Sequence, residues 1–349
     1  MAGKTWQKIV VNILPFLFIF IASLYYPTDP DLGWHLKYGE YFFKNGHPLY
    51  ENIYSTQMTD FRWANIAWAS DIVTYALFRV GGFLGLTIGG ALVVTLAFLF
   101  FSKAYKLDYW EKAITFPILL YLLRPINSNS FRGQLISLAF LGVLTYLTFL
   151  YEERGRKALF YIPVLFLFWS NLHGLFLLGL GIFVLWQGLY LVAKFLEKNR
   201  FINLFPHIKL FVIIDVFSFL ATLIHPFGIG IYRHALTHVN NPLLKGIWEY
   251  LPPEEFSLQW FNLFLTSVLA FVGITYLVFI KTAKQKIPEI GIFSILYILS
   301  IWVKRFAWAM YYTLIPFIKT TAEFIKPDSK KGVFVGATLL FVITTGTVT

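Results

Sequence analysis

The sequence has no cysteine among its 349 residues, and only 13% of its residues are charged. Without cysteine, the chain can form no disulfide bond, no thiolate metal site and no cysteine nucleophile. Soluble domains carry about 25% charged residues, so this chain has roughly half the charge of an ordinary water-facing surface. This shortage excludes an ordinary cytosolic enzyme and an intrinsically disordered chain.

Hydrophobic residues are abundant instead, at 58%, and 20% of the chain is aromatic. They fall in long blocks, and a membrane-spanning helix needs about 20 such residues in succession. The blocks predict an all-α, polytopic transmembrane bundle of about eleven spans in a single domain, residues 1–349. The expected spans are Ile9–Tyr26, Phe83–Phe101, Ala113–Leu123, Leu135–Tyr151, Ala158–Ser170, Leu175–Ala193, Ile208–Ile224, Asn262–Ile280, Ile287–Val303, Phe306–Ile318 and Val333–Val348. The spans that begin at Ala113, Ala158 and Phe306 are short, so we expect tilted or broken helices there.

The positive charge is distributed unevenly along these spans. With the N-terminus in the cytoplasm, most of the 29 Lys and Arg residues, and nearly all of the net charge of +11, fall on the inner side. This asymmetry is typical of an inner (cytoplasmic) membrane protein that follows the positive-inside rule. The basic composition therefore does not indicate a nucleic-acid partner.

Two long outer segments, residues 27–82 and 225–261, interrupt the apolar blocks. Of the seven histidines, only His207 falls on neither the outer loops nor the short outer turns. Polar groups beside a bilayer are energetically costly and tend to mark function. We therefore expect the working face to be extracytoplasmic.

The first outer segment begins with Asp29-Pro30-Asp31. The apolar spacing that follows predicts an amphipathic interfacial helix over residues 31–45, ended by Gly46 and Pro48. Asp31 and His35 share one face of it because they lie four residues apart. A second interfacial helix is expected at Trp63–Gly82. Asp31 and Asp29 then have two interpretations. They are an N-cap and a turn residue, or they supply a carboxylate that acts as a general base or a metal ligand.

Several motifs occur in order along the chain and resemble those of the GT-C glycosyltransferases. The chain resembles a prokaryotic branch of that superfamily that has a D-P-D-x-x-W-H-L loop. It is also distantly similar to the protein O-mannosyltransferases. The matching segments are Asp29-Pro30-Asp31 with Trp34-His35-Leu36; Trp63, Asn65 and Trp68; Arg132-Gly133-Gln134; Trp169 with Asn171-Leu172-His173-Gly174; His225-Pro226-Phe227-Gly228; and Lys304-Arg305-Phe306. Ile66 and Ala67 replace the His-Glu pair of the family, which removes a second acidic contributor unless Asp71 substitutes for it.

The resemblance implies transfer of a sugar from a polyprenyl-phosphate donor to an extracytoplasmic acceptor, with inversion. It implies that Asp31, or failing it Asp29, is the general base, since one carboxylate must accept the proton of the acceptor hydroxyl. If the site uses a divalent cation such as Mg²⁺ or Mn²⁺, Asp29 and Asp31 are its expected ligands. The other expected site residues divide into cations for the donor phosphate (Arg132, Arg124, Arg233, Lys304, Arg305) and groups that orient the reactants or bind the acceptor (His35, His173, Asn171, Trp34).

Other interpretations stay open at the level of sequence. Arg124 and Arg132 can extend to lipid headgroups, and the segment from Asn171 to Gly174 can be a tight turn. A transporter or flippase for a lipid-linked solute is the first alternative function, although it predicts internal repeats that the sequence does not display. A noncatalytic assembly protein on a degenerate GT-C frame is the second.

Overall fold

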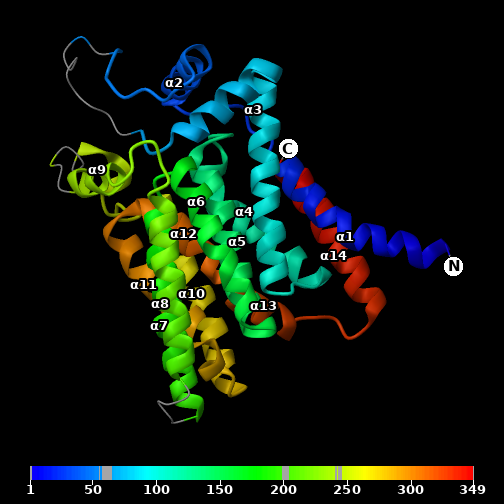
Figure 1. Cartoon of the computed structure of the whole chain (residues 1–349). Helices are drawn as coiled ribbons and strands as arrows, with labels where there is room; N and C mark the ends of the chain where they lie inside the picture. The colour runs from blue at the N-terminus through cyan, green and yellow to red at the C-terminus, as the bar shows by residue number, and fades with distance from the viewer. Residues whose placement is uncertain are drawn as a thin grey trace.

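The computed structural model describes residues 2–54, 56, 65–198, 204–239, 242 and 246–348. Its architecture is all-α, as the sequence predicts (Figure 1). The α-helices are α1 (Ala2–Ala22), α2 (Leu32–Asn45), α3 (Trp68–Ala104), α4 (Tyr109–Asn127), α5 (Gly133–Arg154), α6 (Ile162–Leu172), α7 (Phe176–Lys198), α8 (Phe205–Thr222), α9 (Gly230–Val239), α10 (Leu258–Phe279), α11 (Ile287–Trp302), α12 (Ala307–Tyr311), α13 (Ile315–Phe324) and α14 (Lys330–Val348). Short 3₁₀ turns connect several of them: η1 (Arg156–Tyr161), η4 (Trp248–Tyr250), η5 (Ala283–Lys286), η6 (Lys304–Phe306) and η7 (Tyr312–Leu314).

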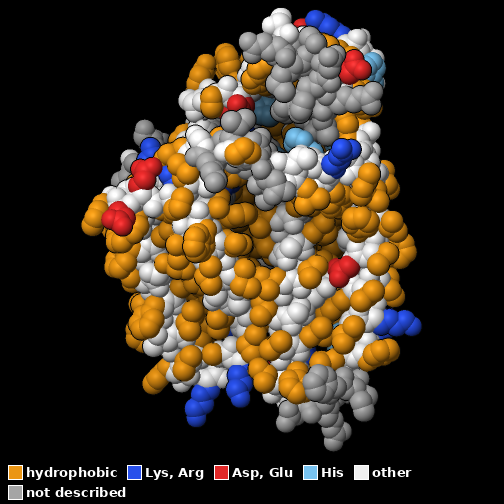
Figure 2. Space-filling view, turned by 90° about the vertical axis from the view of Figure 1, so that its left-hand side faces the viewer, with side chains coloured by type: hydrophobic (Ala, Val, Ile, Leu, Met, Phe, Trp, Pro, Cys, Tyr) orange, Lys and Arg blue, Asp and Glu red, His pale blue; other side chains and the backbone are white. Residues whose placement is uncertain are grey.

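The number of predicted spans was wrong. Among the described residues, five helices are long and apolar enough to cross a membrane, not about eleven. They are Trp68–Ala104, Gly133–Arg154, Phe176–Glu197, Phe205–Thr222 and Leu258–Phe279. These helices make the chain a multi-pass membrane protein, and Figure 2 shows hydrophobic side chains over the middle of the visible face.

The physical reason is that many apolar blocks form short helices. Helix α6 has 11 residues, α11 has 16, α12 has 5 and α13 has 10. In α12 and the first part of α13 the apolar side chains are buried by protein, since Trp308, Met310 and Phe317 are each at most 5% exposed. The block predicted at Phe306–Ile318 is thus broken into short pieces, as expected, and its hydrophobicity fills the interior of the bundle.

Helix α3 consists of two straight parts separated by a kink at Gly82. The backbone of Gly82 has φ 57° and ψ −145°, a conformation that residues with a Cβ rarely adopt. In Figure 1 the first part of α3 crosses the end of the bundle beside α2, and the second part descends along the bundle. A helical part thus ends at Gly82 ahead of the apolar run, as predicted, but it begins at Trp68, since residues 65–67 are not helical; Trp63 lies outside the described residues.

The kinked helix α3 packs against α5, and α5 is the candidate span most buried inside the protein. Helices α1 and α14 lie together at one side of the bundle, where both ends of the chain are found (Figure 1). Helices α2 and α9 lie at the same end of the bundle as the first part of α3. That end carries most of the polar residues that the motifs single out.

Candidate functional site

Helix α2 carries the first motif and has two distinct faces. It begins at Leu32 and ends at Asn45, with Gly46 in the left-handed conformation (φ 75°) after it, so the helix predicted over 31–45 is confirmed. Asp31 occupies the N-cap position, but its side chain makes no cap hydrogen bond. The carboxylate of Asp31 therefore does not cap the N-terminus of α2.

The apolar face of α2 packs against α3 and α5. Leu32 packs on a buried cluster of Leu86, Phe131 and Ile136. Gly39 lies so close to α3 that a Cβ built on it would be 2.3 Å from the carbonyl oxygen of Asp71. Because Gly39 lies one turn after His35, this close approach also fixes the neighbouring side of α2 that carries His35.

The adjoining face of α2 lines a cavity of about 470 Å³. Asp31, Trp34, His35 and Tyr38 contribute to its wall, and their spacing of three, four and seven residues places them along one side of the helix. The remaining lining residues are Leu49, Asn52, Asn65, Ile66, Ala67, Asp71 and His234. A cavity of this size falls in the range of about 300–1,000 Å³ that is typical of small-molecule sites.

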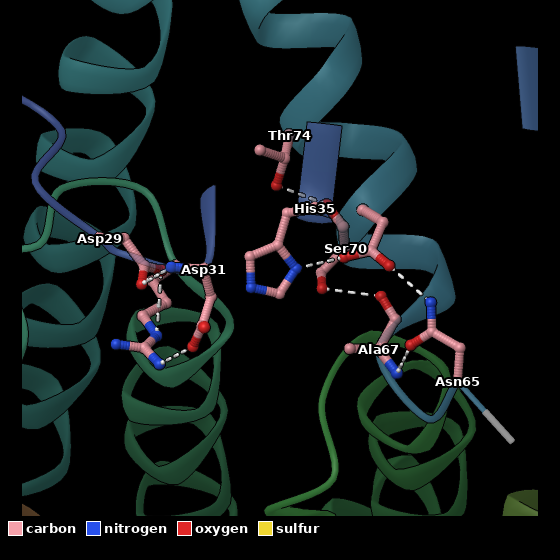
Figure 3. Close-up of polar contacts among 9 residues, drawn as sticks. Asp29, Asp31, His35, Asn65, Ala67, Ser70 and Thr74 are labelled. Atoms are coloured by element: carbon pink, nitrogen blue, oxygen red, sulfur yellow. Dashed lines mark hydrogen bonds and ion pairs between the residues drawn. The ribbon is translucent and has the colours of Figure 1, made fainter. Parts of the chain in front are cut away.

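Arg132, at the start of α5, holds both aspartates of the first motif (Figure 3). Its Nε lies 3.1 Å from Oδ2 of Asp29, and one terminal nitrogen donates a hydrogen bond of 3.1 Å to Oδ2 of Asp31. Oδ1 of Asp29 also accepts a hydrogen bond from the backbone N–H of Asp31 at 3.0 Å. The side chain of Asp29 is 2% exposed, whereas that of Asp31 is 55% exposed. Asp29 is thus buried, and Asp31 stands at the cavity.

These two carboxylates do not fit a divalent cation. Both direct an oxygen at the guanidinium of Arg132, which already supplies the positive charge between them. In the described part of the chain, no three His, Cys, Asp or Glu side chains are grouped closely enough to hold a metal ion. Positions 66 and 67 carry Ile and Ala, whose side chains offer no further metal ligand at this wall of the cavity.

His35 is held by a buried carboxylate on the facing helix. Its Nδ1 lies 2.6 Å from Oδ1 of Asp71, and Nδ2 of Asn65 donates to Oδ2 of Asp71 at 2.5 Å (Figure 3). Burial alone would lower the pKa of His35, but the hydrogen bond and the negative charge of Asp71, aided by Asp29, raise this pKa above 6.5. The ring is thereby fixed, and Asp71 stabilises its protonated form.

Asp71 therefore stays in the site, but as the partner of His35 and not as a metal ligand. Its side chain is 2% exposed. One feature of the sequence could have indicated Asp71 as a site residue: it is a lone acidic residue just before a long apolar run. Nothing in the local pattern of either segment indicates that His35 is its partner.

His173 lies between α6 and α7 and is uncharged. Its Nδ1 is 2.7 Å from Oγ of Ser137, and that oxygen also accepts a hydrogen bond from the indole N–H of Trp169 at 2.8 Å. Burial, followed by the positive charges of Arg305, Arg132 and His35, lowers the pKa of His173 to about 3. His173 does not line the cavity described above, and it supplies no positive charge for a phosphate.

Asn171 joins three parts of the chain. Its Oδ1 accepts a hydrogen bond from the indole N–H of Trp68 at 3.0 Å, and its Nδ2 donates to the carbonyls of Leu167 and Ile224 at 2.8 and 2.9 Å. These contacts tie the start of α3 to α6 and to the end of α8. Asn171 does not line the cavity.

The remaining expected cations are spread over the same end of the protein. Lys304 is 7% exposed; its Nζ lies 3.2 Å from Oε1 of Glu254 and 3.7 Å from the centre of the Trp248 ring. Arg305 pairs with Glu249 and donates a hydrogen bond of 2.7 Å to the Tyr250 hydroxyl.

Arg124 and Arg233 are both exposed, and neither lines the cavity. The structure therefore brings Arg132 to the two aspartates and Arg305 within electrostatic range of His173, but it does not gather all five cations.

Tyr38 and His234 are among the lining residues that sequence reasoning did not assign to the site. Tyr38 could have been found, because it lies seven residues after Asp31 on the same helical face. His234 reaches the cavity from α9, which is almost 200 residues away in sequence. No protein-family model matches the chain, and no curated protein matches it.

Proposed function

We propose that the chain is a membrane glycosyltransferase of the GT-C type, which transfers a sugar from a polyprenyl-phosphate donor to an acceptor outside the cytoplasm. The observation that carries this proposal is the exposed carboxylate of Asp31, fixed by Arg132 at the wall of a cavity that also contains the His35–Asp71 pair. The cavity lies at one end of an apolar helix bundle, which suits a donor that is water-soluble at one end only.

The reaction requires one proton acceptor and one leaving group. The acceptor hydroxyl attacks the anomeric carbon, its proton passes to Asp31, and the bond between that carbon and the phosphate oxygen breaks. The departing polyprenyl phosphate keeps the electron pair of that bond, and its negative charge is neutralised by nearby cations. Arg132 is the guanidinium best placed for this role because it bonds to Asp31 at the cavity wall, and Arg305 is the second candidate because its charge, like that of Arg132, acts on His173.

Asp31 is preferred to Asp29 as the general base because of its exposure. A base must reach the proton that it removes, and the Asp31 side chain is 55% exposed while that of Asp29 is 2% exposed. Asp29 instead holds Arg132 and the first turn of α2. The same proposal includes the orientation of the chain in the membrane, with its N-terminus in the cytoplasm.

The test is the consumption of a panel of radiolabelled polyprenyl-phosphate sugars in proteoliposomes. Asp31→Asn is expected to lower transfer by about 10²–10⁴-fold, the contribution typical of a general base. Glu40→Gln is the matched control, because it removes a carboxylate from the same helix that pairs only with Lys37 and Lys44 among the described residues. Donor movement across the bilayer without donor consumption would instead support the flippase interpretation.

A further inference from the structure

Three aromatic rings lie in mutual contact beside the cavity. The ring centres of Trp34 and Tyr38 are 6.3 Å apart with nearly parallel planes, and the Tyr54 ring meets both of them edge-on at 6.1 and 5.7 Å. The hydroxyl of Tyr54 donates a hydrogen bond to the carbonyl of Lys37, which fixes this third ring against α2. We call Trp34, Tyr38 and Tyr54 the aromatic platform.

The platform is open on one side. Trp34 is 50% exposed and Tyr54 is 36% exposed, while both Trp34 and Tyr38 line the cavity. An exposed indole supported by two other rings presents a flat apolar surface that has already lost its side-chain freedom. Such a surface contributes binding energy at little entropic cost.

Hydrogen-bonding groups surround this flat surface. The carboxylate of Asp31, the imidazole of His35 and the side chain of Tyr38 share the cavity wall with Trp34. Arg132 offsets one of the two negative charges of Asp29 and Asp31, and His35 is paired with Asp71, so the protein leaves no free positive charge at this wall for an anionic ligand. The cavity therefore suits a neutral ligand that has a flat apolar face and a rim of hydroxyl groups.

We infer that the aromatic platform binds a saccharide, and that this saccharide is the acceptor. A pyranose ring has one face of C–H bonds, which packs on an aromatic ring, and hydroxyl groups at its edge, which bond to carboxylate, imidazole and phenol. The half-exposed Trp34 faces the cavity at the end of the bundle where α2 lies, which gives access from water. This inference rests on the proposed function and names the class of its acceptor.

The experiment measures saccharide binding to the full chain in nanodiscs, with no donor present. Saturation-transfer NMR is recorded with cellobiose, mannobiose and chitobiose, and with sorbitol as a polyol that lacks a ring. Saturation is expected on the ring C–H protons of at least one disaccharide and not on sorbitol. Trp34→Ala is expected to weaken that binding at least about fivefold, and Trp34→Phe is expected to retain most of it.

Trp260→Ala is the matched control, because Trp260 is also an exposed indole (41%) but stacks on Phe264 away from the cavity. Trp34 is half-exposed, so its replacement is not expected to unfold the chain, and the thermal unfolding midpoint of each variant checks this. The absence of a disaccharide signal in the wild-type chain would overturn the inference. So would a signal that Trp34→Ala leaves unchanged, since Trp34 would then act only as a membrane-interface anchor.

Donor consumption separates this inference from the proposed function. If polyprenyl-phosphate sugars are consumed but no disaccharide binds, the acceptor class is wrong and the transferase stands. If a disaccharide binds through Trp34 but no donor is consumed, the platform is a saccharide site and the transferase proposal fails.

Discussion

Nδ1 of His35 lies 2.6 Å from Oδ1 of Asp71, so this pair joins the cavity face of α2 to the first turn of α3. Asp71 raises the pKa of His35 above 6.5 against the opposing effect of burial. Because the folded-state pKa is the higher one, the stabilisation is fully present below about pH 6.5 and is lost as pH rises through the folded-state pKa. The free energy of unfolding of the wild-type protein should therefore fall as the pH rises from about 6.5 through the folded-state pKa of His35.

Asp71→Asn should remove this pH dependence. Burial would then dominate, and the pKa of His35 should fall below that in the wild type. Titration of the His35 ring protons by NMR and the thermal unfolding midpoint as a function of pH measure both effects. Glu40→Gln is the control, since Glu40 does not contribute to the pKa shift of His35. An unchanged His35 pKa in Asp71→Asn would show that Asp71 is not its partner in solution.

Gly39→Ala should separate α2 from α3. The new Cβ would lie 2.3 Å from the carbonyl oxygen of Asp71 and 2.4 Å from Cβ of Tyr75, and a helix backbone cannot give way as a flexible side chain can. We expect a loss of about 1–3 kcal/mol in the free energy of unfolding, as for other overpacked contacts, together with a lower pKa of His35.

Gly33→Ala provides the comparison within the same helix. No atom lies within 4 Å of the position that its Cβ would take. Because alanine favours helix, this change should be neutral or stabilising by up to about 1 kcal/mol. Chemical denaturation of both variants in detergent measures the difference. Equal effects at the two glycines would contradict the close packing of Gly39.

Helix α2 was predictable from sequence because its signals are local. The apolar spacing from Leu32 to Phe43, the stop at Gly46 and the shared face of Asp31 and His35 all lie within fifteen or so residues. The kink at Gly82 was predictable for the same reason. The Arg132 contacts were not, because Arg132 and Asp31 lie 101 residues apart and only the tertiary fold brings them together.

The number of spans could not be read from hydrophobicity because lipid and protein interior attract the same side chains. Trp308 and Phe317 are as apolar as any lipid-facing residue, yet they are buried within the bundle. The length of an unbroken helix distinguishes a membrane span from a buried helix, and that length depends on where the chain turns. The 3₁₀ segments η6 and η7 precede α12 and α13 and keep both helices short.

Arg132→Ala should create a cation site that the wild-type chain lacks. Removal of the guanidinium leaves Asp29 and Asp31 facing each other without a counter-charge, and two carboxylates are suitable ligands for Mn²⁺. We expect Mn²⁺ binding, measured by electron paramagnetic resonance, in Arg132→Ala but not in wild type or in Arg124→Ala. Activity of the wild type should also be insensitive to chelators. Chelator-sensitive transfer would contradict the role assigned to Arg132.

Lys304→Met should separate stability from donor binding. Methionine fills a similar volume, and Glu254, the partner of Lys304, is 63% exposed on its side chain, so no buried charge is left unpaired. The change in the free energy of unfolding should therefore stay within about 1 kcal/mol, because replacing such a pair by an apolar residue is often neutral.

Donor affinity should fall in Lys304→Met if the donor phosphate replaces Glu254 as the partner of Lys304. A charge-assisted hydrogen bond contributes about 1.5–3 kcal/mol, which corresponds to a loss of about ten- to a hundredfold in affinity. Lys326→Met is the control, since Lys326 also forms an ion pair, with Asp108, but follows α13, which Figure 1 shows at the other end of the bundle from α2. Binding of a polyprenyl-phosphate sugar, measured in nanodiscs, should be the same in Lys326→Met as in the wild type. Equal donor affinity in wild type and Lys304→Met would restrict the phosphate contacts to Arg132 and Arg305.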